Sequence, residues 1–189
     1  MKKRIFIFTF FYFMMIPIFI YPITLVRVGY IDLDFIIQTY TKNYLDTEIT
    51  LREDYISQLQ GEYNENYFGL TEAEKSNIQI KLRDQRDVLS MLRYNLLFWD
   101  RTGEIRDDII LQIIQRDLIE SIKKTSELEG FSLVLDNTGN FIYGSEDINL
   151  TDRVLFRLDE KLLDLQNNEP LAPLSLELEE NIDILSTGD

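Results

Sequence analysis

The sequence predicts an α+β protein in which a small β-rich body carries a long antiparallel pair of helices. Three observations lead to this prediction. A strand-like segment at 26–31 stands near the start of the chain. About a hundred residues of mainly helical periodicity follow it. Strand-like segments return only after Gly130, ahead of one last short helical stretch and an acidic tail.

The N-terminal segment has the pattern of an export signal. Three basic residues at positions 2–4 precede an apolar run from Ile5 to Val26, and a basic flank before an apolar run directs export. The run is long enough to cross a bilayer, although two prolines toward its end favour cleavage. We therefore expect 1–26 to be a signal peptide or a signal anchor, with the rest of the chain outside the cytoplasm.

The next elements are a strand and a first helix. Residues 26–31 alternate between β-branched or aromatic residues and small or polar ones, which predicts a strand. From Asp34, apolar and aromatic residues recur at intervals near three and four, which predicts a helix. The glycine- and asparagine-rich segment from Gly61 to Leu70 predicts the turn that ends it.

A second, longer helix is predicted after this turn. Thr71 and Glu74 have the spacing of a capping box, which marks a helix start. The apolar pattern passes a weak point at Arg101–Gly103, where a kink near Gly103 is an alternative to a straight helix, and runs to about Leu128. A straight helix of this extent would be roughly 85 Å long. Two helices joined by one turn predict a projecting antiparallel coiled-coil hairpin over 34–129.

The last third of the chain predicts a β-hairpin, a helix and a tail. Residues 131–135 and 141–143 are apolar and branched, with a turn-forming sequence between them. Thr151 is expected to cap a helix from Asp152 to about Leu165. Residues 167–189 are acidic and contain no basic residue, which predicts a disordered tail.

Three short strands make a marginal sheet with exposed edges, so we expect self-association. Closing strands from several copies into one barrel would bury those edges and create a core. The strand residues expected to form this interface are Val28, Tyr30, Leu133, Leu135, Phe141 and Tyr143.

Composition argues against several function classes. The chain has 19 Lys and Arg against 33 Asp and Glu, no histidine and no cysteine. Such a negative surface disfavours nucleic acid, and the missing residue types remove the commonest metal ligands, general base and thiol chemistry. No catalytic constellation is recognisable, so we expect neither an enzyme, nor a bound metal, nor a cofactor.

Two β segments together resemble a known family. The first is Val28-Gly-Tyr-Ile-Asp32, followed at once by helix. The second is Gly130-Phe-Ser-Leu-Val-Leu-Asp136, continuing through Phe141-Ile-Tyr143 to Leu150-Thr-Asp-Arg-Val-Leu155. In order and spacing they are similar to the Skp (OmpH-like) periplasmic chaperones, over about Val26 to Leu162.

The resemblance implies a homotrimer in the periplasm. Residues 27–33 and 130–166 would form a β-rich oligomerisation body, and 34–129 a helical tentacle. Members of that family hold unfolded outer-membrane and other exported proteins without ATP and prevent their aggregation. This chain departs from the strongly basic members, because residues 32–129 contain 12 basic and 20 acidic residues.

The expected client-binding residues are Tyr63, Tyr67 and Phe68, at the predicted tip of the hairpin, where little packing is available. An alternative is a structural or adaptor protein of the cell envelope, anchored through residues 5–26 and using the coiled coil as a spacer. In both cases membrane contact would occur only through residues 5–26, if they are not cleaved.

Overall fold

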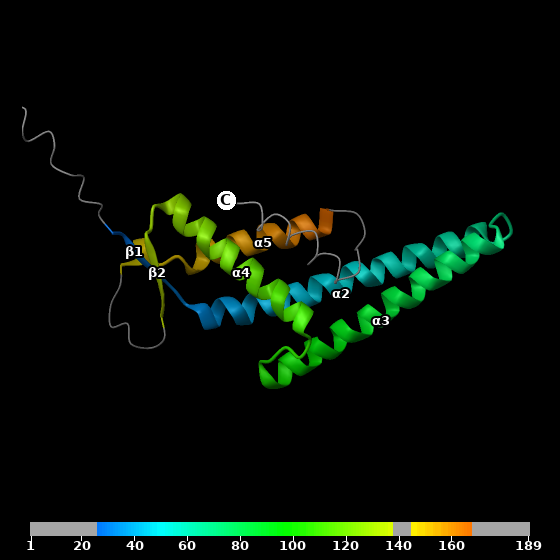
Figure 1. Cartoon of the computed structure of the whole chain (residues 1–189), viewed down its shortest axis with the longest axis horizontal. Coiled ribbons are helices and arrows are strands. Elements are labelled where there is room, and N and C mark those ends of the chain that lie inside the picture. The colour runs from blue at the N-terminus through cyan, green and yellow to red at the C-terminus, as the bar shows by residue number, and fades with distance from the viewer. Residues whose placement is uncertain (1–25, 138–144, 168–189) are drawn as a thin grey trace, which may run out of the picture.

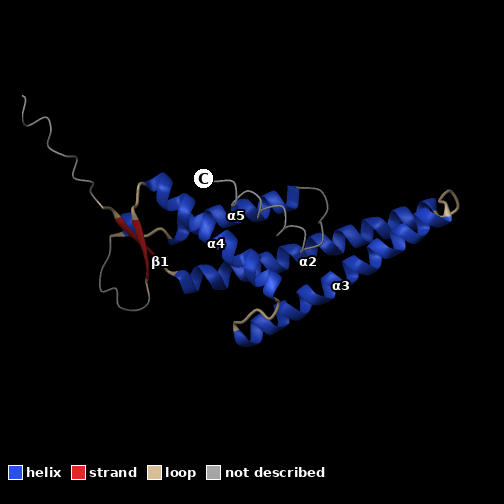
Figure 2. Ribbon diagram, viewed as in Figure 1, coloured by secondary structure: helices blue, strands red, loops and turns tan. Residues whose placement is uncertain are grey.

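The computed structural model describes residues 26–137 and 145–167, which form a mostly helical structure with a small parallel sheet (Figures 1 and 2). This confirms the α+β class in its general form. The elements in chain order are β1 (Val28–Ile31), α2 (Leu33–Asn66), α3 (Glu72–Thr102), α4 (Asp108–Glu129), β2 (Leu133–Asp136), the short 3-10 helix η2 (Glu146–Ile148) and α5 (Thr151–Asn167).

Helices α2 and α3 run antiparallel, and their connected ends project away from the rest of the molecule (Figure 1). Helix α2 begins at the cap Asp32, whose side chain accepts a hydrogen bond from the backbone of Phe35. The predicted capping box at the start of α3 is confirmed, with Thr71 and Glu74 each accepting from the other's backbone N–H. That the pair is a coiled coil stays a prediction.

The first helix is longer than the sequence predicted. Helix α2 continues through Gly61 to Asn66, so the turn is confined to the residues just before α3. The sequence pattern places Gly61 in the turn, because glycine weakens helices. Here it lies on an open helix surface, where no heavy atom is within 4 Å of the position of an added Cβ. The interhelix packing on either side outweighs its low propensity.

The expectation of one helix from Thr71 to Leu128 is wrong. Helix α3 ends at Thr102, and Gly103 adopts a left-handed conformation with φ 69°. An elbow (residues 103–107) follows, and α4 then starts at the cap Asp107, whose side chain accepts from two backbone N–H groups. The range 34–129 therefore contains three helices, and α4 lies beside α5 at the base of the molecule (Figure 1).

Asn95 fixes this elbow. Its side chain is 2% exposed, and its Oδ1 accepts hydrogen bonds from the backbone N–H groups of Arg106 (3.1 Å) and Asp107 (3.2 Å). Its Nδ2 donates to the Met91 carbonyl at 3.0 Å. One buried amide thus satisfies backbone groups that the break in the helix leaves without helical partners.

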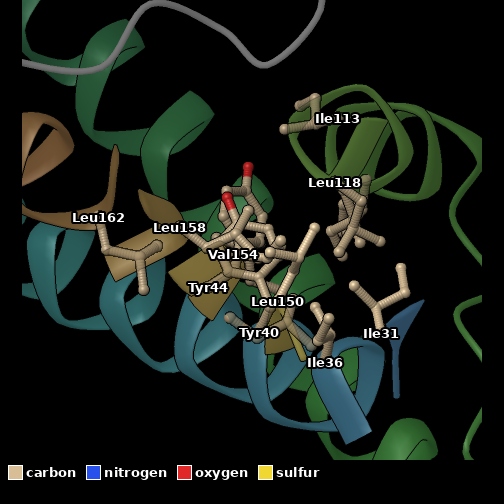
Figure 3. Close-up of a cluster of buried hydrophobic side chains, with 14 of the residues drawn as sticks. Ile31, Ile36, Tyr40, Tyr44, Ile113, Leu118, Leu150, Val154, Leu158 and Leu162 are labelled. Atoms are coloured by element: carbon tan, nitrogen blue, oxygen red, sulfur yellow. The ribbon is translucent and has the colours of Figure 1, made fainter. Parts of the chain in front are cut away.

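The main core joins the base of α2 to α4, α5 and the end of α3. Side chains from these helices converge on one apolar cluster that also includes Ile31 from the sheet (Figure 3). Its buried members are Ile31, Ile36, Tyr40, Tyr44, Leu45, Leu92, Ile110, Ile113, Ile114, Leu118, Phe131, Leu150, Val154, Leu158 and Leu162. A second, smaller cluster holds the projecting part of α2 and α3, and consists of Ile56, Leu59, Leu82 and Leu89.

The described sheet is parallel. Strand β1 pairs with β2 in the register Val28↔Leu133 to Ile31↔Asp136. A single parallel bridge from Tyr30 to Asn149 adds to the other side of β1. The expected antiparallel partner, residues 141–143, lies outside the described residues. Parallel strands need a long crossover, and here the crossover is the whole helical segment from α2 to α4.

The last helix is confirmed, and it extends from Thr151 to Asn167. Thr151 is its first residue, and the hydroxyl predicted to cap the helix instead accepts a hydrogen bond from the backbone N–H of Asp32 at 2.9 Å. This contact ties the start of α5 to the junction between β1 and α2. The predicted tail lies, apart from Asn167, outside the described residues.

Alanine substitutions at two glycines test these helix boundaries. Gly61→Ala should raise the free energy of unfolding by about 0.5–1 kcal/mol, because Gly61 lies inside a helix with open space around it. Gly103→Ala should lower it by about 1–2 kcal/mol, because a Cβ is strained at positive φ. Urea unfolding followed by circular dichroism measures both. Destabilisation by Gly61→Ala would show that α2 ends before position 61.

Candidate binding surfaces

The tip of the helical pair carries the exposed aromatic residues that the sequence singled out. Phe68 is 100% exposed and Tyr67 is 41% exposed, while Tyr63 is half-buried. The three rings are in contact in series, with centroid distances of 5.4 Å for Tyr63–Tyr67 and 5.6 Å for Tyr67–Phe68, both edge-to-face. The structure therefore brings the three predicted residues together.

The inner part of this aromatic row is held in place and the outer part is not covered. Gln79 on α3 donates a hydrogen bond to the Tyr63 hydroxyl at 3.0 Å. The Lys75 ammonium lies 4.4 Å from the centroid of the Tyr67 ring, a cation–π contact. Phe68 stands at the turn with its whole side chain in solvent. A rigid support with an exposed aromatic end is suited to binding an apolar partner.

The sheet presents an apolar face at the opposite end of the molecule from the tip (Figure 1). Val28, Leu133 and Leu135 are 38%, 48% and 42% exposed, and Tyr30 is half-buried. The register places Val28 opposite Leu133 and Tyr30 opposite Leu135, so the four side chains share one face. The remaining predicted strand residues, Phe141 and Tyr143, lie outside the described residues.

The other face of the sheet is packed against the core. Gly29 and Ile31 of β1 are buried, and a Cβ built on Gly29 would lie 2.8 Å from Leu150 and 3.2 Å from Phe131. Glycine thus permits the close approach of β1 to the segment before α5. The sheet is therefore packed against the core on one side, and Val28, Leu133 and Leu135 are exposed on its other side.

An apolar cleft beside the elbow was not predicted. It has a volume of about 360 Å³ and lies between α2, the end of α3 and α4. Its lining is Ile37, Thr41, Trp99, Gly103, Glu104, Ile105, Leu111, Ile114, Gln115 and Leu118. The signal in the sequence was Trp99 and Ile105 on either side of the weak point at Gly103, but their proximity to Ile37 depends on the direction in which α4 turns.

A buried carboxylate joins three helices at the base. Asp117 on α4 accepts hydrogen bonds from the Tyr40 hydroxyl (2.7 Å) on α2 and from Lys161 Nζ (2.9 Å) on α5. Burial, together with the Asp117 carboxylate, raises the pKa of Tyr40, so its hydroxyl stays a donor. Burial alone lowers the pKa of Lys161, but its bonds to Glu120 and Asp117 outweigh burial and raise that pKa. The Tyr40 hydroxyl and the Lys161 ammonium thus both donate hydrogen bonds to the Asp117 carboxylate.

A second buried polar cluster lies on α2 between Leu45 of the main apolar cluster and Ile56 of the smaller one. Arg52 Nη2 lies 3.1 Å from Glu48 Oε2, and both side chains are fully buried. Arg52 Nη1 also donates to Gln85 Oε1 on α3 at 2.7 Å. Other atoms of the ion pair, including Glu48 Oε1 and Arg52 Nε, have no hydrogen-bond partner. Burial raises the pKa of Glu48 against the opposing effect of Arg52.

Within residues 26–137 and 145–167, no group of three acidic, histidine or cysteine side chains could hold a metal ion. In the same ranges no helix has the length and hydropathy needed to cross a membrane. The predicted signal or anchor lies, apart from Val26, outside them.

Comparison with known proteins leaves the family of this chain open. No family model matches the chain. No curated protein matches it either. The resemblance to the Skp family therefore rests on the two β segments alone, and everything it implies about function is a proposal.

Removing Arg52 tests whether the buried ion pair is a constraint on α2 and α3. Arg52→Met leaves the Glu48 carboxylate buried without a cation, so we expect a loss of about 3–5 kcal/mol in the free energy of unfolding at neutral pH. The double variant Glu48→Leu/Arg52→Met should recover most of it, because no buried charge remains. Arg93→Met, which removes the exposed pair with Glu53, is the control and should cost about 1 kcal/mol or less.

The decrease in the free energy of unfolding caused by Arg52→Met should also depend on pH. Without Arg52 the folded-state pKa of Glu48 rises further above its unfolded value, so the folded state gains stability by taking up a proton. That stability is present at low pH and is lost as the pH rises through the folded-state pKa. The difference from the wild type should therefore shrink as the pH falls from neutral toward about 4.5. Urea unfolding at several pH values measures this, and a constant difference would contradict it.

Proposed function

We propose that this protein is an ATP-independent holdase chaperone that binds unfolded exported proteins and prevents their aggregation. The observation that carries the proposal is the exposed aromatic row at the tip, where Phe68 is fully exposed and Tyr67 half-exposed. A large apolar side chain held in water at the end of a projecting pair of helices, in contact with only the edge of one neighbouring ring among the described residues, leaves most of its surface available to a partner. Burying one such side chain against a partner is worth about 1.5–3 kcal/mol.

Contacts of this strength suit a holdase. A protein that prevents aggregation must bind the unfolded state and release it for folding, which favours weak contacts that act together. Three arms on one trimer would raise the apparent affinity by about 10²–10⁴ without any new type of contact. No ATP, cofactor or metal is part of this proposal, and neither is catalysis.

The apolar face of the sheet supports assembly into a homotrimer. It is formed by Val28, Tyr30, Leu133 and Leu135, on a sheet of two short strands that is marginal by itself. Strands from three copies would cover this face and the strand edges together. Because the sheet and the tip lie at opposite ends of the described structure (Figure 1), assembly would leave the tips free.

The proposed location is the periplasm, with residues 1–26 as the export signal. Clients would then be outer-membrane or other exported polypeptides in an unfolded state. The charge of the chain, −14 at pH 7, disfavours nucleic acid as a partner. Contact with a membrane would be limited to residues 5–26, if they are retained.

The alternative function is an anchored structural or adaptor protein of the envelope. It would use the same helices as a spacer, and it requires that residues 5–26 stay in the mature protein. N-terminal sequencing of the exported protein separates the two functions. An intact N-terminus favours the adaptor, whereas a start near position 27 favours the soluble holdase.

The holdase proposal predicts protection from aggregation that depends on Phe68. Dilution of a urea-unfolded β-barrel protein into buffer should give strongly reduced light scattering when the protein is present in molar excess. Phe68→Ser should lose most of this protection, because it removes the largest exposed apolar side chain of the tip. Phe156→Ser on α5 removes an exposed ring (64%) that lies away from the tip, and it is the control. Unchanged scattering with the wild type would refute the holdase proposal.

The trimer proposal predicts that charges on the sheet face abolish assembly. Light scattering coupled to size exclusion should give three times the chain mass for the wild type. Leu133→Asp/Leu135→Asp should give a monomer, because buried unpaired carboxylates oppose association. The control Ile119→Asp/Leu163→Asp adds the same charge at exposed positions on α4 and α5 and should stay trimeric. A monomeric wild type would contradict the proposal.

A further inference from the structure

The distal arm, defined as residues 53–80 of α2, the turn and α3, has an unusual distribution of charge. It contains six acidic residues and one basic residue, Lys75. The acidic residues are Glu53, Asp54, Glu62, Glu65, Glu72 and Glu74. Of these, Glu62, Glu65 and Glu72 flank the aromatic row in sequence, and all three are exposed. The apolar tip therefore belongs to a segment with an excess of negative charge.

The one cation of the distal arm is already engaged. Lys75 Nζ lies 2.9 Å from Glu72 Oε1 and 4.4 Å from the centre of the Tyr67 ring. Its side chain is 16% exposed, while that of Glu72 is 91% exposed. The hydrogen bond to Glu72 raises the pKa of Lys75. Lys75 therefore packs against the Tyr67 ring with little exposure to solvent, and the exposed charged groups of the tip are carboxylates.

Hydrogen bonds near the turn stabilise the charged form of the Glu74 carboxylate. Glu74 accepts hydrogen bonds from the backbone N–H of Thr71 (2.8 Å) and from its hydroxyl (2.7 Å). These bonds lower the pKa of Glu74. Glu62 and Glu65 are on the last turns of α2 and face solvent. A partner that covers Phe68 must therefore place its own neighbouring groups within the field of these charges.

An exposed apolar ring beside several carboxylates favours some apolar partners over others, according to their charge. A bilayer with anionic lipids and an acidic polypeptide would both be repelled as they approached the tip. An apolar segment with Lys or Arg on either side would gain the contact with Phe68 and also the attraction of the carboxylates. The aliphatic parts of Lys and Arg can in addition cover the exposed ring.

We propose that the tip binds apolar polypeptide segments flanked by lysine or arginine. This inference rests on the proposed holdase function and names the class of client that the arm selects. Apolar contact with Phe68 supplies the affinity, and the exposed carboxylates supply the choice among apolar segments. A cationic arm would instead be expected to favour apolar segments flanked by acidic residues.

A peptide series on the wild-type protein tests the charge selection directly. Three fluorescein-labelled peptides share one apolar core and carry Lys, Gln or Glu on both sides of it. Fluorescence anisotropy at low salt should give affinities in the order Lys, Gln, Glu, with roughly a tenfold difference or more between the first and last. The difference should largely vanish at about 1 M salt, where the Debye length is about 3 Å.

Two matched pairs of substitutions locate the effect. Glu62→Gln/Glu65→Gln removes two charges beside the aromatic row and should reduce the Lys-over-Glu ratio several-fold, with little change for the Gln-flanked peptide. Asp159→Asn/Glu160→Gln removes the same charge from exposed positions on α5 and should leave the ratio unchanged. Phe68→Ser should weaken binding of all three peptides.

The outcomes separate this inference from the proposed function. Equal affinity for the three peptides, in a protein that still prevents aggregation, overturns the charge selection alone. If the ratio of the affinities for the Lys-flanked and Glu-flanked peptides falls equally in both charge variants, the charge selection does not occur at the tip. Phe68-dependent sedimentation with phosphatidylcholine vesicles would assign the tip to a bilayer surface and overturn the inference. Absence of both peptide binding and protection from aggregation overturns the inference and the holdase function together.

Discussion

The parallel pairing of β1 with β2 is the constraint on which the rest of the structure depends. It fixes the two ends of the helical segment next to each other, so the helices must return to where they started. Helix α2 has 34 residues, a length of about 51 Å. A continuous helix from the start of α3 to the end of α4 would be about 87 Å long and would pass far beyond the sheet. The elbow at Gly103 removes this mismatch, and it sends α4 back across α2 to reach β2.

The buried polar groups contribute more to the arrangement of the helices, including the direction of α4, than to the free energy of unfolding. Asn95 holds the elbow through backbone hydrogen bonds, and Asp117 joins α4 to Tyr40 and Lys161 of its two neighbours. Each of these contacts has one geometry in which all partners are satisfied, so each excludes other arrangements of the same apolar helices. The Glu48–Arg52 pair leaves some of its polar atoms without a hydrogen-bond partner, but it links α2 to α3 through the bond from Arg52 to Gln85. A buried ion pair adds little stability, but it can fix the register of two helices.

The arrangement separates two exposed apolar surfaces that have different environments. The sheet face is flat, belongs to short strands and lies beside the main core, which suits association with copies of itself. The tip has a single fully exposed ring among carboxylates, which suits brief contact with other chains. The projecting part of α2 and α3 has a small cluster of four buried residues, Ile56, Leu59, Leu82 and Leu89. We therefore expect its stability to depend on the main core. Because the two surfaces lie at opposite ends of the described structure (Figure 1), separate substitutions can test the proposed assembly and the proposed client contact.

Local patterns determined the elements of this protein. Alternation identified the strand at 26–31, the spacing of Thr71 and Glu74 identified the start of α3, and the position of Tyr63, Tyr67 and Phe68 in a turn-like segment identified the tip. These signals depend on neighbours a few residues apart, so they survive without knowledge of the fold. The predicted end of α2 near Gly61 was wrong for the same reason. Low helix propensity is a local property of glycine, and here the packing on both sides of Gly61 outweighs it.

Only the tertiary structure decided how these elements meet. The break at Gly103 was visible as a weak point, but the direction of α4 depends on Asn95, which reaches across the elbow to backbone groups eleven and twelve residues away. The cleft between Ile37 and Trp99, the bond from Thr151 to the Asp32 backbone, and the parallel order of β1 and β2 all join segments distant in sequence. Such contacts form because the chain must bury its apolar faces against one another, and no local pattern encodes which faces will meet.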